Sequence, residues 1–238
     1  MNVVVSHWSA NAAVLAAVAA VTAVHLRGLH GVAADARRGG GMPRGLGREV
    51  AAFYGGLCFL FGSFVFAYFY LRSINASGRW LGSGYHAPSM VYGTVVMIAV
   101  LLSAGIHYAA LQQAKAGHKR LWQIGALIAL LLGVAAIILQ ILELLFLPFW
   151  PGSSGFSSVF TGFYPVLIVV LLAAMIWLET LLARSRFIPA ISFVEQPPTY
   201  KEAFTVQRFQ SSLSGFATVW NFLAVITVLF WVLFYVMP

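Results

Sequence analysis

Long apolar stretches alternate with short polar ones along the chain, and this pattern predicts six membrane-spanning helices. A bilayer core about 30 Å thick needs roughly 20 apolar residues in a helix. The stretches that meet this length are residues 9–26, 50–71, 90–111, 121–149, 159–182 and 213–237. The sequence lacks the ten-residue alternation typical of a transmembrane barrel. We therefore expect an all-α, polytopic membrane helical bundle.

The composition excludes a soluble globular enzyme. Of the 238 residues, 61% are hydrophobic and 8% are charged, whereas a typical soluble domain has roughly 25% charged residues. The net charge of +8 does not indicate a nucleic-acid partner, because the basic residues lie between apolar runs rather than on one polar face. We expect no nucleic acid to bind.

The first apolar stretch is predicted to remain in the protein as a helix. A cleaved signal peptide carries its positive charge before the apolar stretch. Here no charged residue precedes Arg27. The chain is therefore divided into residues 1–49, an extra amino-terminal transmembrane helix with a basic cytoplasmic loop, and residues 50–238, a five-helix membrane domain.

The basic residues predict the orientation of the chain. Twelve of the fourteen lie in the loops after the first, third and fifth apolar stretches. Cytoplasmic loops carry an excess of Lys and Arg, so we expect these loops inside and both termini outside. The two longest loops are residues 27–49, a Gly- and Arg-rich linker, and residues 185–212, which we expect along the membrane surface.

Cofactor ligands are scarce. A haem between helices needs two His at similar depth on neighbouring helices, and only the pair His25 and His107 could meet this condition, with a packed His107 as the alternative. The single cysteine, Cys58, excludes an internal disulfide framework and a clustered Cys metal site. We expect no catalytic, cofactor-binding or metal-binding residue in this chain.

Two acidic residues fall within the predicted spans, where charge is expensive and marks functional candidates. Glu143 follows Gln140 by three residues, which places both on one helix face. Glu143 could face a partner helix, a lipid headgroup or a proton path, or it could simply form a hydrogen bond with Gln140. Glu179 is expected at a membrane interface, near the end of its helix.

The clearest functional signal in the sequence is a set of small residues that favour packing between helices. Small residues at four-residue or similar spacings let helix backbones approach closely. They are Ala12, Ala16 and Ala20 in the first predicted helix, Gly55, Gly56, Gly62 and Ser63 in the second, and Gly105 and Ala109 in the third. A transporter is disfavoured because a polar midplane and broken helices are missing.

Ordered motifs run through the last five predicted helices. They are residues 56–72, ending Ala-Tyr-Phe-Tyr-Leu-Arg; Trp80, Thr94 and Ser103; Gly133, Gln140 and Glu143; residues 157–163, Ser-Ser-Val-Phe-Thr-Gly-Phe; and Trp220, Phe222 and Tyr235. In this order the motifs resemble subunit III of the haem–copper oxidases, over about residues 50–238. The amino-terminal segment weakly resembles the opening of a membrane protein that assembles copper into cytochrome oxidase.

The chain departs from the family pattern at polar positions. Gly56 and Leu57 stand where the family has a Ser followed by a buried Glu. Tyr164 and Leu167 replace two His, and Asn221 and Ala224 replace a His and an Asp. In the family these positions are tied to bound lipid and to proton uptake.

The resemblance implies a non-catalytic membrane subunit of a respiratory terminal oxidase in the bacterial cytoplasmic membrane, supporting stability, lipid binding and proton uptake. Its partners would be the catalytic subunit I-like and the subunit II-like proteins, with haem and copper in the catalytic partner and phospholipid on this chain. The candidate polar sites for lipid or subunit contact are Gln140, Glu143, Trp220 and Asn221. The alternatives are an assembly factor that delivers copper or haem and an accessory subunit of a nitric oxide reductase.

Overall fold

A computed structural model describes residues 44–75, 80–82, 88–188 and 200–238, which belong to one compact unit. The described residues form helices joined by short loops, with no strand among them. The helices are α2 (Arg44–Ile74), α3 (Met90–Lys115), α4 (Lys119–Leu145), α5 (Gly155–Ser185) and α6 (Tyr200–Trp231), and α6 continues into the π-helix η1 (Val232–Val236). The first predicted span, residues 9–26, lies outside the described residues.

Five of the predicted spans are confirmed as helices long and apolar enough to cross a membrane. They are Ala51–Ile74, Met90–Lys115, Lys119–Leu145, Gly155–Ser185 and Arg208–Val236, with mean hydropathies between 1.7 and 2.7. At 1.5 Å per residue, the shortest of them is about 36 Å long, which exceeds the thickness of a bilayer core. The fold is that of a multi-pass membrane protein.

The predicted boundaries between α4 and α5 are wrong by several residues. α4 ends at Leu145 rather than at residue 149, because Pro148 offers no backbone N–H and disfavours helical geometry in the residue before it. α5 begins at Gly155 rather than at residue 159, because Ser154 and Ser157 form a capping box, each side chain accepting from the other's backbone N–H.

The long polar loop predicted over residues 185–212 is also corrected. α6 starts at Tyr200, shortly after Pro197 and Pro198, so the carboxyl-terminal part of this segment is helical. Likewise α2 begins at Arg44, inside the predicted linker. In both cases a helix extends beyond its apolar stretch into polar sequence, where hydropathy gives no signal.

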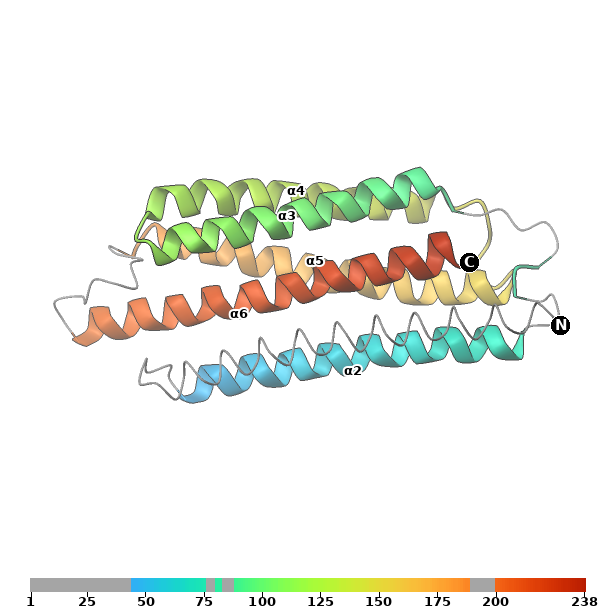
Figure 1. The fold of residues 1–238 in the computed structure, drawn as a ribbon, viewed down its shortest axis with the longest axis horizontal. Coiled ribbons are helices and arrows are strands. Elements are labelled where there is room, and N and C mark those ends of the chain that lie inside the picture. The colour runs from blue at the N-terminus through green and yellow to red at the C-terminus, as the bar shows by residue number, and fades with distance from the viewer. Residues whose placement is uncertain (1–43, 76–79, 83–87, 189–199) are drawn as a thin grey trace. The chain divides into compact units, whose positions relative to one another are not determined.

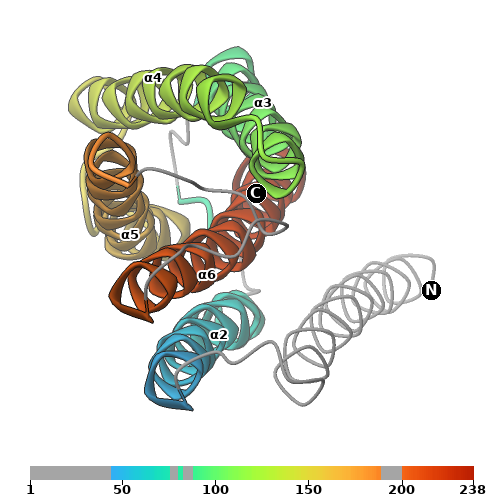
Figure 2. The same ribbon diagram turned by 90° about the vertical axis from the view of Figure 1, so that its left-hand side faces the viewer.

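The five helices run side by side along the long axis of the bundle (Figure 1). Viewed along that axis, α3, α4, α5 and α6 form a ring, and α2 lies outside it against α6 (Figure 2). Since consecutive helices are antiparallel, the ends of α2, α4 and η1 meet the beginnings of α3 and α5 at one end of the bundle. We call this the Glu143 end.

α3 and α4 form the most extensive helix pair. A three-residue turn joins them, and Gly117 adopts the left-handed conformation (φ +85°) that this turn requires. Gly125 faces Ala110, and a Cβ at Gly125 would lie only 2.7 Å from that of Ala110. Small residues therefore let these helices approach closely. Of the small residues predicted for this role, Gly105 and Ala109 instead lie on the exposed face of α3.

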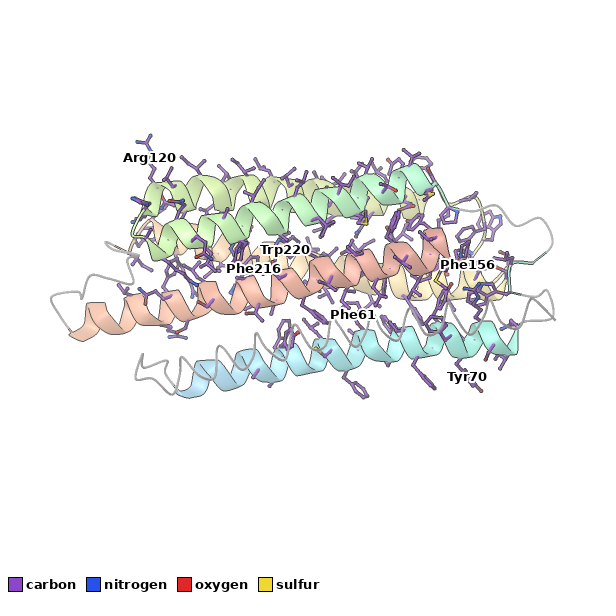
Figure 3. The ribbon with its side chains drawn as sticks, in the orientation of Figure 1. Phe61, Tyr70, Arg120, Phe156, Phe216 and Trp220 are labelled. Atoms are coloured by element: carbon purple, nitrogen blue, oxygen red, sulfur yellow. The ribbon has the colours of Figure 1, made fainter. Side chains whose placement is uncertain are left out.

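Aromatic side chains pack α2 against the rest of the bundle. Phe61 is buried, makes an edge contact with Phe230 and lies tilted against Phe222, both of α6. Phe64 stacks on Phe163 of α5 at 4.3 Å. Figure 3 shows Phe61 pointing into the bundle and Tyr70 pointing away from it. Aromatic pairs of this kind add to the stabilisation that packing alone provides.

Two polar side chains near the end of α2 hold the end of η1. The Tyr68 hydroxyl has one proton, which it shares between the carbonyl oxygens of Leu233, at 2.8 Å, and Met237. The Arg72 guanidinium donates to the Met237 carbonyl oxygen at 2.7 Å. These bonds satisfy carbonyl groups that a helix end leaves without partners. The Tyr68–Arg72 clamp thus gives a structural role to part of the motif in residues 56–72.

Candidate functional site

Glu143 is the one acidic side chain buried among the described residues. It lies two residues before the end of α4 and is 7% exposed. Ala136, Gln140 and Glu143 recur at three- and four-residue spacings and belong to the buried stripe of α4. Both predicted polar residues of this helix therefore share the face that points into the bundle.

Two tyrosines from other helices bind the Glu143 carboxylate. Tyr164 of α5 donates to Oε2 at 2.9 Å, and Tyr235 of η1 donates to Oε1 at 2.6 Å. The two hydroxyl oxygens are 3.3 Å apart. A single polar cluster thus ties together three helices that are distant in sequence, at the Glu143 end of the bundle.

The charge of this carboxylate is not balanced within the described part of the chain. There, the hydrogen-bond partners of Glu143 are two hydroxyl groups, and no Lys, Arg or His nitrogen lies within 4.0 Å of it. Burying an ionised carboxylate is costly unless it is paired. Glu143 must therefore either carry a proton or face a cation that comes from outside this part of the chain.

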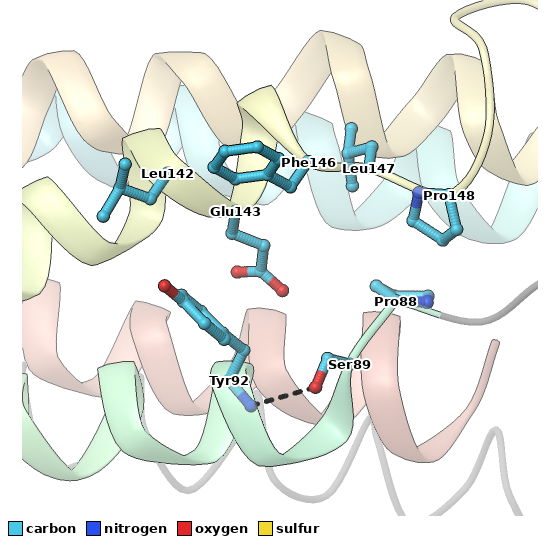
Figure 4. A pocket seen from close by; sticks show the side chains of 8 residues that line it. All are labelled: Pro88, Ser89, Tyr92, Leu142, Glu143, Phe146, Leu147 and Pro148. Atoms are coloured by element: carbon cyan, nitrogen blue, oxygen red, sulfur yellow. Dashed lines mark hydrogen bonds between the residues drawn. The ribbon is translucent and has the colours of Figure 1, made fainter.

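A surface pocket of about 310 Å³ opens beside Glu143. Figure 4 shows the Glu143 side chain reaching from α4 toward α3, with the Tyr92 ring next to it. The pocket is lined by Pro88, Ser89, Tyr92, Leu142, Glu143, Phe146, Leu147 and Pro148. The carboxylate is therefore accessible from one side and hydrogen-bonded by the bundle on the other.

Gln140 borders a separate internal cavity of about 10 Å³, which Tyr164 and Tyr235 also line. The Gln140 side chain is fully buried, and neither its Oε1 nor its Nε2 has a hydrogen-bond partner among the described residues. The alternative prediction of a hydrogen bond between Gln140 and Glu143 is therefore wrong. The reason is that the Glu143 carboxylate binds the tyrosines of α5 and η1 instead. Gln140 lies about one helical turn deeper in the bundle.

Trp220 and Asn221, the other predicted polar sites, lie elsewhere. They precede Tyr235 by 15 and 14 residues, which is about 20 Å along a helix. Trp220 is fully buried and stacks on Phe216, and Asn221 is half-buried. The structure brings Gln140 near Glu143 but does not bring Trp220 or Asn221 to the same site.

The residues considered for cofactors are placed as follows. His107 is buried in a T-shaped contact with Phe216, which agrees with the alternative prediction of a packed His107. His25, its predicted partner in binding a haem, lies outside the described residues. Glu179 is exposed near the end of α5. In the described part of the chain, no three His, Cys, Asp or Glu side chains are grouped so that they could hold a metal ion.

Sequence reasoning did not place Tyr164 and Tyr235 next to Glu143. A buried tyrosine hydroxyl usually needs a partner, so each tyrosine in an apolar span was a candidate partner for Glu143. A second signal is Gly93: a Cβ there would overlap the Tyr235 ring. The absence of a side chain at residue 93 is what lets this ring lie between α3 and Glu143.

Comparison with known proteins assigns no family to the chain. No protein-family model matches it, and no curated protein matches its sequence.

Proposed function

We propose that this chain is a non-catalytic, subunit III-like membrane subunit of a respiratory haem–copper terminal oxidase complex. The observation that carries the proposal is the ordered set of motifs on five successive helices. In this proposal the chain crosses the bacterial cytoplasmic membrane six times, with both termini outside. It packs against a subunit II-like protein and against a catalytic subunit I-like protein, and the catalytic subunit holds the haem and copper.

The contacts made by motif residues support the proposal. Tyr68 and Arg72 of the first motif bind the carbonyl groups at the end of η1. Glu143 and Tyr235, from the third and fifth motifs, bind each other. The contact between Glu143 and Tyr235 is expected if their two motifs belong to one structural pattern.

The arrangement around Glu143 supports a role for this residue beyond packing. The family's polar His is replaced by Tyr164, yet a polar contact to Glu143 is present at this position. The carboxylate also lines an open pocket. We propose that lipid binding at this end of the bundle contributes to the stability of the complex and supports proton uptake by the catalytic partner.

The experiment that tests the proposal is purification of the affinity-tagged full chain from its native membrane in mild detergent. The expected result is co-purification of a larger subunit that contains haem, seen in the difference spectrum between reduced and oxidised samples. A tagged, unrelated multi-pass protein from the same membrane is the control. Recovery of this chain alone and monodisperse, in several mild detergents, would contradict the proposal.

A further inference from the structure

We propose that the pocket beside Glu143 binds the ammonium group of a zwitterionic phospholipid. This inference deepens the lipid-binding part of the proposed function and rests on that part alone. Its basis is the buried carboxylate and the cavity next to it, both of which belong to the described residues of this chain.

The first argument is charge. Both oxygens of Glu143 accept hydrogen bonds from tyrosine hydroxyls, an arrangement that suits the ionised form because an ionised carboxylate only accepts. The described part of the chain offers no basic group to balance the charge. Because a buried charge needs a partner, a cation in the adjoining pocket would complete the site.

The second argument is the lining of the pocket. Two aromatic rings, Tyr92 and Phe146, line it together with the carboxylate and two prolines. An organic ammonium is attracted both to a carboxylate and to the faces of aromatic rings. A hydrated metal ion would find a single carboxylate and few other oxygen ligands here, whereas hard divalent cations take six or more.

The third argument is the position of the helix ends. Ser89 caps α3, and its hydroxyl oxygen accepts from the backbone N–H of Tyr92 at 3.4 Å. The first backbone N–H groups of a helix lack carbonyl partners and favour a phosphate group. The pocket therefore presents a carboxylate on one wall and a helix N-terminus on the other, which matches the paired charges of a zwitterionic headgroup.

The fourth argument is the surface next to the pocket. One helical turn farther from the Glu143 end, Val95 of α3 and Ile138 of α4 are 48% and 52% exposed. Both helices are long and apolar enough to cross a membrane. The acyl chains of a lipid whose headgroup occupies the pocket can lie along these apolar side chains, so the bound molecule is a phospholipid rather than a soluble amine.

The test is native mass spectrometry of the delipidated full chain in detergent, with equal amounts of phosphatidylcholine or phosphatidylethanolamine against phosphatidylglycerol. We expect the wild type to prefer the zwitterionic lipids by about tenfold, the equivalent of roughly 1.4 kcal/mol. Glu143→Gln should abolish this preference. Glu179→Gln, which removes an exposed carboxylate from α5, is the matched control and should retain it.

Two variants of Tyr92 keep the test valid if Glu143→Gln fails to fold. Tyr92→Leu removes the ring and should weaken binding of the zwitterionic lipids, whereas Tyr92→Phe keeps the ring and should bind like the wild type. Equal preference in the wild type and Glu143→Gln, or a wild-type preference for phosphatidylglycerol, would overturn the inference. Because the isolated chain is used, this result is independent of whether a haem-bearing partner exists.

Discussion

Tyr235 donates a hydrogen bond to Oε1 of Glu143 at 2.6 Å, and this contact joins two residues 92 positions apart in the chain. Tyr235 lies in the π-helix at the end of α6, and Glu143 lies in the last turn of α4. π-helical turns occur frequently at functional sites. Here the π-helix places the Tyr235 ring over Gly93 and its hydroxyl on the carboxylate.

Removing the Tyr235 hydroxyl should destabilise the bundle. Tyr235→Phe leaves Oε1 of Glu143 without its 2.6 Å donor, and we expect a loss of about 1–2 kcal/mol in the free energy of unfolding. Tyr108→Phe, on the exposed face of α3, is the control and should have no effect. Unfolding followed by circular dichroism in mild detergent measures both, and equal stability of the two variants would show that the Tyr235–Glu143 bond contributes nothing.

A side chain at residue 93 should displace the Tyr235 ring. In Gly93→Ala the new Cβ would overlap ring atoms of Tyr235, and relieving such overpacking typically costs about 1–3 kcal/mol. Gly105→Ala is the matched control, because a Cβ at Gly105 would meet no atom within 4 Å. The midpoint of thermal unfolding should fall in the first variant only; a Gly93→Ala protein as stable as Gly105→Ala would argue against close packing of this ring.

Loss of the Tyr68–Arg72 clamp should loosen the end of η1. The double variant Tyr68→Phe/Arg72→Leu removes the donors to the carbonyl oxygens of Leu233 and Met237. At about 1 kcal/mol per bond, hydrogen exchange of the η1 backbone amides should rise by about fivefold or more. Arg120, exposed at the other end of the bundle (Figure 3), provides the control Arg120→Gln, which should leave this exchange unchanged. Unchanged exchange in the double variant would refute the clamp.

Replacing Gln140 by leucine should be tolerated. In the described part of the chain both polar atoms of its side chain are buried without a partner, and such groups cost about 1–3 kcal/mol each. Gln140→Leu, which keeps a similar volume, should therefore be at least as stable as the wild type, whereas Gln140→Ala should be less stable because it enlarges the neighbouring cavity. A strong destabilisation by leucine would show that a water molecule in the 10 Å³ cavity bonds to the amide.

The five predicted helices that fall on described residues could be found from the sequence because a membrane span has a minimum apolar length. The ends of the helices could not, because they depend on local capping and on proline rather than on hydropathy. Ser154 and Ser157 start α5 before its apolar stretch, and Pro148 follows closely on the end of α4. α6 begins in polar sequence at Tyr200, where hydropathy gives no indication of a helix.

Glu143 could be singled out from the sequence because a carboxylate in a membrane span is expensive. Its partners could not, since they depend on which helices are neighbours and on how each is rotated. Tyr164 is brought to Glu143 by the packing of α5 on α4. Tyr235 is brought there by a π-helix, in which side chains point in other directions than in an α-helix, and the hydropathy pattern gives no sign of it.

The measurement that tests the central claim most directly is the reduced-minus-oxidised absorption spectrum of the tagged full chain, purified from its native membrane in mild detergent. The account predicts haem bands that co-elute with this chain and reside in a larger partner subunit after the two are separated. A preparation that contains the folded chain without any haem-bearing partner would contradict the assignment to an oxidase complex.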